Sequence, residues 1–163
     1  MLIADSLIAA ELSSIRSRGT LTDESLRRLD ALLSGDGVLE RALEALDGGA
    51  VTKLTSAPSG RVAWSITSSL SRRSGAELSG IDFRASGVAP DSYTYTVLLD
   101  GPGVCTCADF AARVLGDGES AARRVCKHIL AAALGDALGA ASRARARALT
   151  DEELAKLLLL AFS

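Results

Sequence analysis

The cysteines and the histidine of this chain are confined to one short stretch of sequence. The chain has three cysteines and one histidine, Cys105, Cys107, Cys126 and His128. They form a C-x-C pair, a gap of eighteen residues and a C-x-H pair. Structural zinc sites take four thiolate or imidazole ligands in a tetrahedron, and three cysteines with one histidine are a common set. The sequence therefore predicts one zinc site made by all four side chains; the alternative is three buried thiols and an unrelated histidine.

The C-x-C and C-x-H pairs require different backbone conformations to bind one ion. Residues i and i+2 of a strand face the same side, so Cys105 and Cys107 can reach one ion together. In a helix the same two positions are about 200° apart, so Cys126 and His128 are expected where a loop enters a helix. Asp109 is close in sequence and is interpreted as a solvated or helix N-terminal acid rather than as the fourth ligand.

Apolar spacing predicts helices at both ends of the chain and strands between them. Thr22 is a predicted helix N-cap, and Thr150 with Glu153 predicts a capping box before the last helix. Strands are predicted at Val51–Ala57, Arg61–Ser68, Tyr93–Leu99 and Val104–Cys107. Helices are predicted at residues 2–15 and 23–33 and at Val38–Leu46, Asp109–Leu115, Cys126–Leu138 and Asp151–Phe162.

These elements divide the chain into three parts. Residues 1–49 are a helical N-terminal region, and residues 50–140 carry the strands and both ligand pairs. Residues 141–163 are interpreted as a basic linker and a C-terminal helix. A Pro-Ser-Gly turn makes the first two strands a hairpin, with Trp64 and Ile66 on one face. Residues 69–91 are rich in Ser, Gly and Arg and are interpreted as a flexible insertion.

Charge and cysteine usage limit the kinds of partner and compartment. The net charge is −2, but residues 1–50 carry nine acids against five bases and residues 104–147 seven bases against four acids. The basic part is either a contact surface near the cysteines or a solvated surface. We expect no membrane span and no secretory leader. An odd, clustered set of cysteines is typical of a reducing, intracellular compartment.

The ligand spacing resembles the SWIM zinc finger, a C-x-C and C-x-H pattern on a ββα scaffold. The sequences CTCADF and VCKHILAAAL fit this pattern, with Phe110 at the family's apolar position, where we expect it to pack in the core. The sequence VTKLTSAPSGRVAWSI and the helices before it are similar to the Sws-type subunit of the Shu complex, the zinc finger SWIM domain-containing protein seven family. The resemblance extends from Leu26 to Leu138.

The resemblance implies an α+β fold. In it, N-terminal helices, a small antiparallel hairpin sheet and a helix surround the SWIM-type zinc site, and a C-terminal helix follows. It also implies a nuclear, non-enzymatic adaptor in homologous-recombination DNA repair. Such subunits pair with a RecA-like recombinase paralogue and promote recombinase filament assembly on single-stranded DNA, with no membrane and no small-molecule substrate.

Arg123, Arg124 and Lys127 are the candidates for contacts with the partner or with DNA phosphates. They would also stabilise thiolates close to a helix N-terminus. Solvated charges fit the same pattern equally well.

Three other functions are weighed against the adaptor. Direct nucleic-acid binding is disfavoured because the net charge is negative and aromatic stacking platforms are few. A docking finger of another machine, such as a ubiquitin ligase or a transposase, would be accompanied by further domains. A zinc enzyme keeps one coordination position open, whereas four protein ligands fill it here and leave no histidine for a catalytic dyad.

Overall fold

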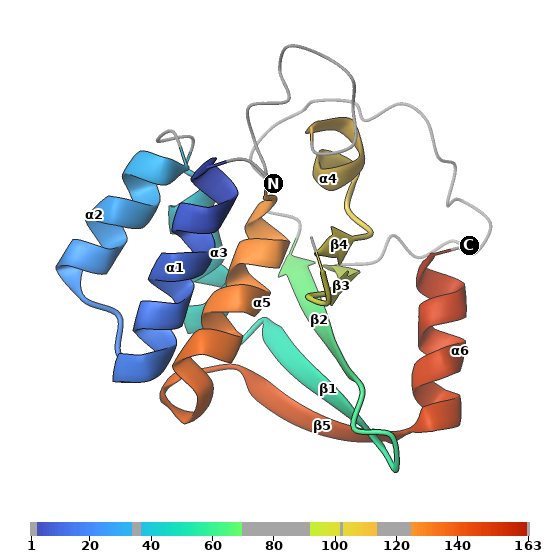
Figure 1. Ribbon diagram of the computed structural model, residues 1–163. Helices are drawn as coiled ribbons and strands as arrows, with labels where there is room; N and C mark the ends of the chain where they lie inside the picture. The colour runs from blue at the N-terminus through green and yellow to red at the C-terminus, as the bar shows by residue number, and fades with distance from the viewer. Residues whose placement is uncertain (1–2, 34–36, 70–91, 102, 114–124, 163) are drawn as a thin grey trace.

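The computed structural model describes residues 3–33, 37–69, 92–101, 103–113 and 125–162 (Figure 1). The predicted insertion therefore lies outside the described residues from residue 70 onward. The described helices are α1 (Ile3–Arg18), α2 (Asp23–Leu32), α3 (Val38–Asp47), α4 (Ala108–Arg113), α5 (Lys127–Leu138) and α6 (Asp151–Ala161), with a 3-10 turn η2 (Gly139–Ala141). The described strands are β1 (Val51–Ala57), β2 (Val62–Ser69), β3 (Ser92–Leu98), β4 (Val104–Cys105) and β5 (Arg145–Thr150). The order confirms the predicted α+β class. None of the described helices is long and apolar enough to cross a membrane.

Both predicted helix starts are confirmed. The hydroxyl of Thr22 accepts a hydrogen bond from the backbone N–H of Ser25 at 3.2 Å. At the start of α6, Thr150 and Glu153 form a reciprocal capping box, in which the carboxylate of Glu153 accepts the N–H of Thr150 at 2.7 Å. These contacts satisfy N–H groups that a helix start otherwise leaves unpaired.

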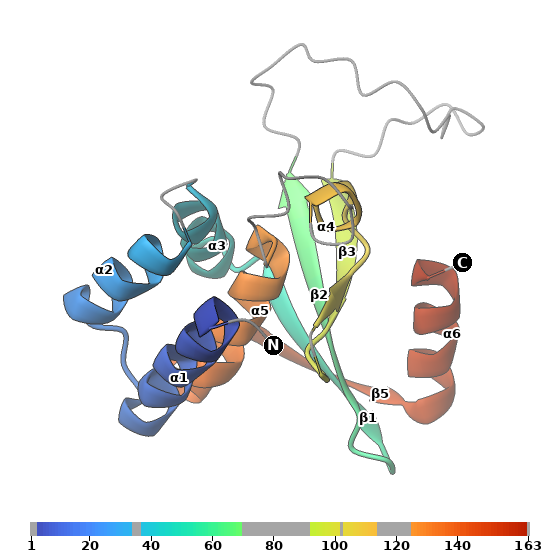
Figure 2. The same cartoon turned by 45° about the horizontal axis from the view of Figure 1, so that its top comes forward.

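The helices α1, α2, α3 and α5 lie together on one side of the sheet, and α6 lies on the other (Figure 1, Figure 2). Within the helical layer α5 packs against both α1 and α3. A Cβ at Gly135 of α5 would lie 3.2 Å from Trp64 and 3.3 Å from Leu46. This close approach accounts for a glycine in the middle of a helix, where it costs about 1 kcal/mol relative to alanine.

The sheet has the strand order β4-β3-β2-β1-β5. The neighbours from β4 to β1 are antiparallel, as the predicted hairpin and return strand require. In contrast, β5 runs parallel to β1, with Thr52 opposite Arg145 and Ala57 opposite Thr150. The structure therefore differs from the expectation of a small antiparallel sheet followed by a basic linker. The alternating arginines belong to an edge strand. Its partner β1 is parallel and distant in sequence, so no turn sequence between the two strands predicts their pairing.

Different helices bury the two faces of the sheet. Trp64 and Ile66 share one face, as predicted, and this is the face that α5 covers. Both lie in the main core, which also includes residues of α1 and α3. A second, smaller cluster on the opposite face consists of Leu54, Ala63, Leu149 and Leu154 of α6. The sheet thus separates two apolar layers.

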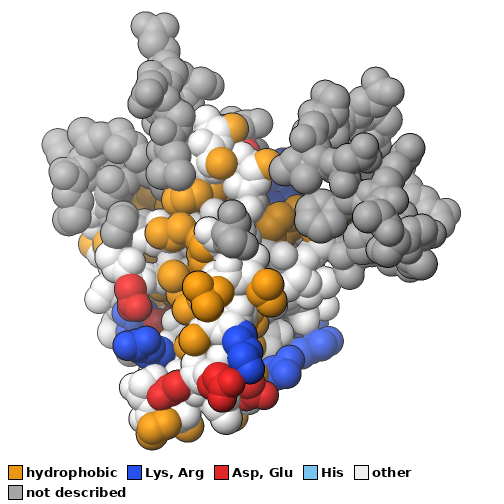
Figure 3. Space-filling model, turned by 90° about the vertical axis from the view of Figure 1, so that its right-hand side faces the viewer, with side chains coloured by type: hydrophobic (Ala, Val, Ile, Leu, Met, Phe, Trp, Pro, Cys, Tyr) orange, Lys and Arg blue, Asp and Glu red, His pale blue; other side chains and the backbone are white. Residues whose placement is uncertain are grey.

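The leucine-rich helix α6 docks on the sheet through one face. Leu154 is buried, and Leu157 and Leu158 pack against the smaller cluster. The outer side leaves Leu159 and Leu160 72 and 82 % exposed. Hydrophobic side chains gather accordingly on the face of the molecule that carries α6 (Figure 3).

Candidate metal centre

Cys105 and Cys107 enter the site from the end of β4. Cys105 is the last residue of that strand and lies opposite Val97 of β3. Cys107 follows after one residue, and its carbonyl oxygen accepts the N–H of Phe110 at 3.1 Å and that of Ala111 at 3.2 Å, which starts α4. A two-residue strand and a turn therefore bring the two sulfurs together, where the sequence predicts a longer strand.

Cys126 and His128 enter from the first turn of α5. Cys126 is the N-cap, with φ −85° and ψ 164°, and its sulfur accepts the N–H of Ile129 at 3.5 Å. Because the cap residue has extended rather than helical backbone, its side chain escapes the separation of about 200° that i and i+2 would have inside a helix. The predicted loop-to-helix junction is confirmed.

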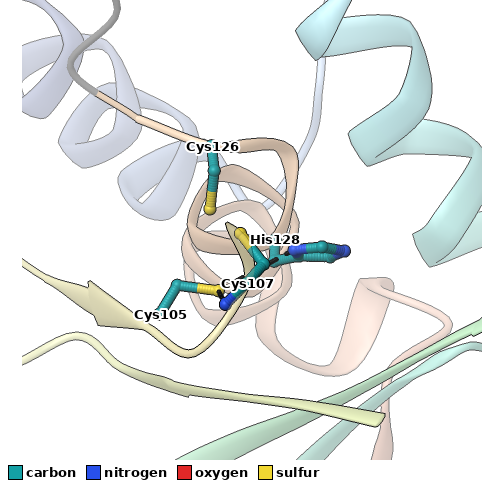
Figure 4. A group of neighbouring side chains, drawn as sticks. All are labelled: Cys105, Cys107, Cys126 and His128. Carbon is teal, nitrogen blue, oxygen red and sulfur yellow. Dashed lines mark hydrogen bonds between the residues drawn. The ribbon is translucent and has the colours of Figure 1, made fainter. Parts of the chain in front are cut away.

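The four candidate ligand atoms form one compact, buried group (Figure 4). They all lie within 4.8 Å of one another, and none of the four residues is more than 4 % exposed. The distance from Cys105 Sγ to His128 Nδ1 is 3.8 Å. Zinc bonds of about 2.3 Å to sulfur and about 2.0 Å to nitrogen put tetrahedral ligand atoms about 3.5–3.8 Å apart. The four residues are therefore close enough to hold one metal ion.

Backbone N–H groups point at all three sulfurs. The N–H of Cys107 donates to Cys105 Sγ at 3.4 Å, that of Phe110 donates to Cys107 Sγ at 3.3 Å, and Ile129 donates to Cys126. Hydrogen bonds donated to sulfur favour the thiolate, which is the form that binds metal. Phe110 itself is buried in the main core beside the cluster, as predicted.

The pKa values of the three thiols are shifted in different directions. Hydrogen bonds from Cys105 and Cys126 lower the pKa of Cys107 well below its usual range. The hydrogen bonds to Cys107 and Cys126, together with burial, raise the pKa of Cys105 far above its usual range. For Cys126 the hydrogen bond with Cys105 lowers the pKa, but the bond to Cys107 and burial outweigh it and raise the pKa to about 11. A divalent ion bound by the cluster would displace the thiol protons, because thiolates are the form that binds metal.

Tyr95 of β3 also belongs to the site, although no motif marks it. Its ring stacks on the imidazole of His128, with centroids 4.3 Å apart and planes at 27°. The Nε2 atom of His128 is buried and has no hydrogen-bond partner among the described residues. A signal for Tyr95 exists in the strand alternation, because Tyr95 and Val97 share a face and Val97 lies opposite Cys105.

The charged residues predicted near the ligands are placed only in part. Arg123 and Arg124 lie outside the described residues. Lys127 is the first residue of α5, half-buried next to Cys126, and makes no ion pair with another described residue. Asp109 lies in the first turn of α4 and is not one of the four clustered residues, which agrees with its interpretation as a helix N-terminal acid.

Comparisons with models of known protein families, with curated proteins and with solved structures give no significant match. The site is thus defined by its own residues, as a buried cluster of three cysteines and one histidine that could bind a metal ion such as zinc.

Proposed function

We propose that a structural zinc ion is held by Cys105, Cys107, Cys126 and His128. The observation that carries this proposal is the convergence of the four donors, all buried, within 4.8 Å. Thiolate ligands select zinc over magnesium or calcium, and four protein ligands leave no open position for a substrate. The backbone hydrogen bonds to the sulfurs support the same assignment.

Zinc would connect two distant segments of the chain. Cys105 ends the edge strand β4 and Cys107 follows it, whereas Cys126 and His128 start α5, the central helix of the main core. Zinc binding contributes about 10–16 kcal/mol in small zinc peptides. An ion here would therefore hold β4 and α4 against α5, in addition to the apolar contacts of Phe110.

We propose further that the chain is a non-enzymatic SWIM-type adaptor in homologous-recombination DNA repair. The support is the resemblance of both ligand pairs and of the hairpin sequence to the Shu-complex subunit. A closed, four-ligand site agrees with a role in folding and docking rather than catalysis. The proposed partner is a RecA-like recombinase paralogue in the nucleus, and single-stranded DNA would be reached through that complex.

The zinc assignment is tested by metal analysis of the purified full chain. We expect one zinc per chain by mass spectrometry and its loss in the Cys126→Ser variant, because the remaining three donors no longer close the tetrahedron. The matched control is Thr67→Ala, an exposed position of β2, which should keep the metal. A wild-type chain without zinc, or a Cys126→Ser chain that keeps it fully, would contradict the proposal.

The adaptor role has a separate test. The tagged chain is recovered from its native cells, and we expect a RecA-like ATPase paralogue with the wild type and with Thr67→Ala but not with Cys126→Ser. A zinc-loaded chain without any such partner would leave the metal site intact and refute the adaptor role. Recovery of the paralogue with a zinc-free variant would refute the dependence of docking on zinc.

A further inference from the structure

The strand β5 forms a free edge of the sheet. It pairs with β1 on one side, and none of the described residues pairs with its other side. Figure 1 shows it as the outermost strand beyond β1. Half of the N–H and C=O groups of an edge strand point away from the sheet, so they are open to another strand. Every residue of β5 except Leu149 is exposed.

The side chains of β5 alternate between two faces. Arg147 lies opposite Leu54, whose side chain belongs to the cluster under α6. Arg145 and Arg147 therefore point to the face that carries α6, whereas Ala146 and Ala148 point to the other face. The free edge thus offers guanidinium groups on one side and small methyl groups on the other.

The two guanidinium groups are not committed to acids of the described chain. Neither Arg145 nor Arg147 forms an ion pair with another described residue. Glu153 shares a cleft of about 280 Å³ with Arg147. The N–H of Thr150, and to a smaller extent the charge of Arg147, lowers the pKa of Glu153. Its carboxylate is already bonded to Thr150 at 2.7 Å, however, so it serves the capping box.

We propose that the free edge of β5 binds an extended segment of another protein, with acidic residues at every second position and apolar residues between them. Strand addition satisfies the open backbone groups and sets the register. Carboxylates of the segment then meet Arg145 and Arg147, and the intervening side chains lie over the alanines. A second copy of this chain does not fit, because two paired β5 strands would bring their arginines together. The surface is separate from the metal cluster, so this inference does not depend on the proposed function.

The test uses the full chain as purified and a fluorescent nine-residue peptide of alternating glutamate and valine. We expect binding that weakens as salt is raised, and slowed hydrogen exchange of the backbone amides at 145–150. The same peptide with lysine in place of glutamate should bind on the order of tenfold more weakly, a difference that corresponds to about 1.4 kcal/mol. The double variant Arg145→Glu with Arg147→Glu should reverse this preference.

Two further controls separate backbone pairing from charge alone. A glutamate–valine peptide that is N-methylated at every residue keeps the charge but cannot pair, and it should not bind. If the charge-reversed chain does not fold, the double variant Arg145→Gln with Arg147→Gln replaces it. This variant should bind the acidic peptide more weakly than the wild type does, and it should not bind the basic peptide. The proposal is overturned by equal binding of the acidic and basic peptides, by binding of the methylated peptide, or by no binding of the acidic peptide. Tighter binding of a single-stranded oligonucleotide at the same amides would assign the arginines to phosphates instead.

Discussion

His128 has different surroundings at its two ring nitrogens. Nδ1 lies 3.8 Å from Cys105 Sγ, whereas Nε2 is buried without a hydrogen-bond partner among the described residues. Metal-bound histidines are commonly oriented by an acceptor at the second nitrogen. In this site the ring face is held by Tyr95, whose own pKa is raised first by burial and then by the charge of Cys107. The orientation of the imidazole therefore depends on an aromatic contact.

Replacement of Tyr95 tests this dependence. We expect Tyr95→Ala to lower zinc affinity by about tenfold, because changes next to a metal ligand typically cost 10–100-fold. Tyr95→Phe is the matched control, since it keeps the stacked ring and should bind zinc like the wild type. Competition against a chromophoric chelator measures both. Affinities of Tyr95→Ala and the wild type that agree within a factor of two would show that the stack does not orient His128.

Three elements of the main layer meet at Asp136 of α5. Its carboxylate accepts hydrogen bonds from Lys53 of β1 at 2.8 Å and from Arg16 of α1 at 2.5 Å. The Lys53 ammonium also lies 5.3 Å from the ring centroid of Trp64. Burial raises the pKa of Asp136, but the contacts with Lys53 and Arg16 outweigh it and lower the pKa. This polar contact ties α5 to α1 and to β1.

We expect Asp136→Asn to reduce the free energy of unfolding by about 1 kcal/mol at neutral pH, because the partners are partly exposed and screened. A carboxylate with a lowered pKa stabilises the fold fully above its unfolded pKa of about 3.9 and loses this effect as pH falls through the folded value. The difference between variant and wild type should therefore shrink below about pH 4. Denaturant titrations of both proteins over a pH series measure this difference in the free energy of unfolding.

The control for Asp136 is Glu152→Gln. Glu152 pairs with Lys156 at 2.7 Å on the outer side of α6, with side chains 78 and 68 % exposed. An exposed pair of this kind is worth about 0.3–0.5 kcal/mol. An equal loss of stability in the two variants would mean that Asp136 contributes no more than a surface pair.

The described residues form two apolar layers, and the candidate metal cluster lies in one of these. The main core includes the three cysteines, Phe110 and the buried face of α5, whereas the smaller cluster lies beneath α6 on the opposite face of the sheet. The strand β4, which ends in Cys105, is only two residues long, and among the described strands it pairs with β3 alone. Few backbone hydrogen bonds among the described residues therefore hold this edge, so a bound metal ion would contribute most of its local stability.

Removal of the metal should consequently loosen one region first. With a chelator we expect faster hydrogen exchange at residues 103–113 and 125–130, because the metal ion no longer joins β4 and α4 to the start of α5. Exchange in α2, which is remote from the cluster, serves as the internal control and should change least. Hydrogen-exchange mass spectrometry of the full chain measures both. A uniform change along the chain, or no change, would contradict a local structural role for the ion.

The features that the sequence determined by itself arise from interactions between residues that are close in the chain. Thr22 and the Thr150–Glu153 capping box act over three residues, and the hairpin is specified by a turn of a few residues between its strands. The candidate ligand set follows from composition, because the chain has only one histidine and three cysteines. The junction at Cys126 follows from helical geometry alone. For these features, no knowledge of the rest of the molecule is needed.

The tertiary structure alone decided the contacts between segments that are distant in sequence. Arg145–Thr150 resembles a charged linker locally, and it becomes a strand because β1 offers it a parallel edge. Likewise, Tyr95 meets His128 only once β3, β4 and α5 are assembled. The free energy of such contacts comes from backbone pairing and apolar burial shared across the molecule, so no local window of sequence contains it.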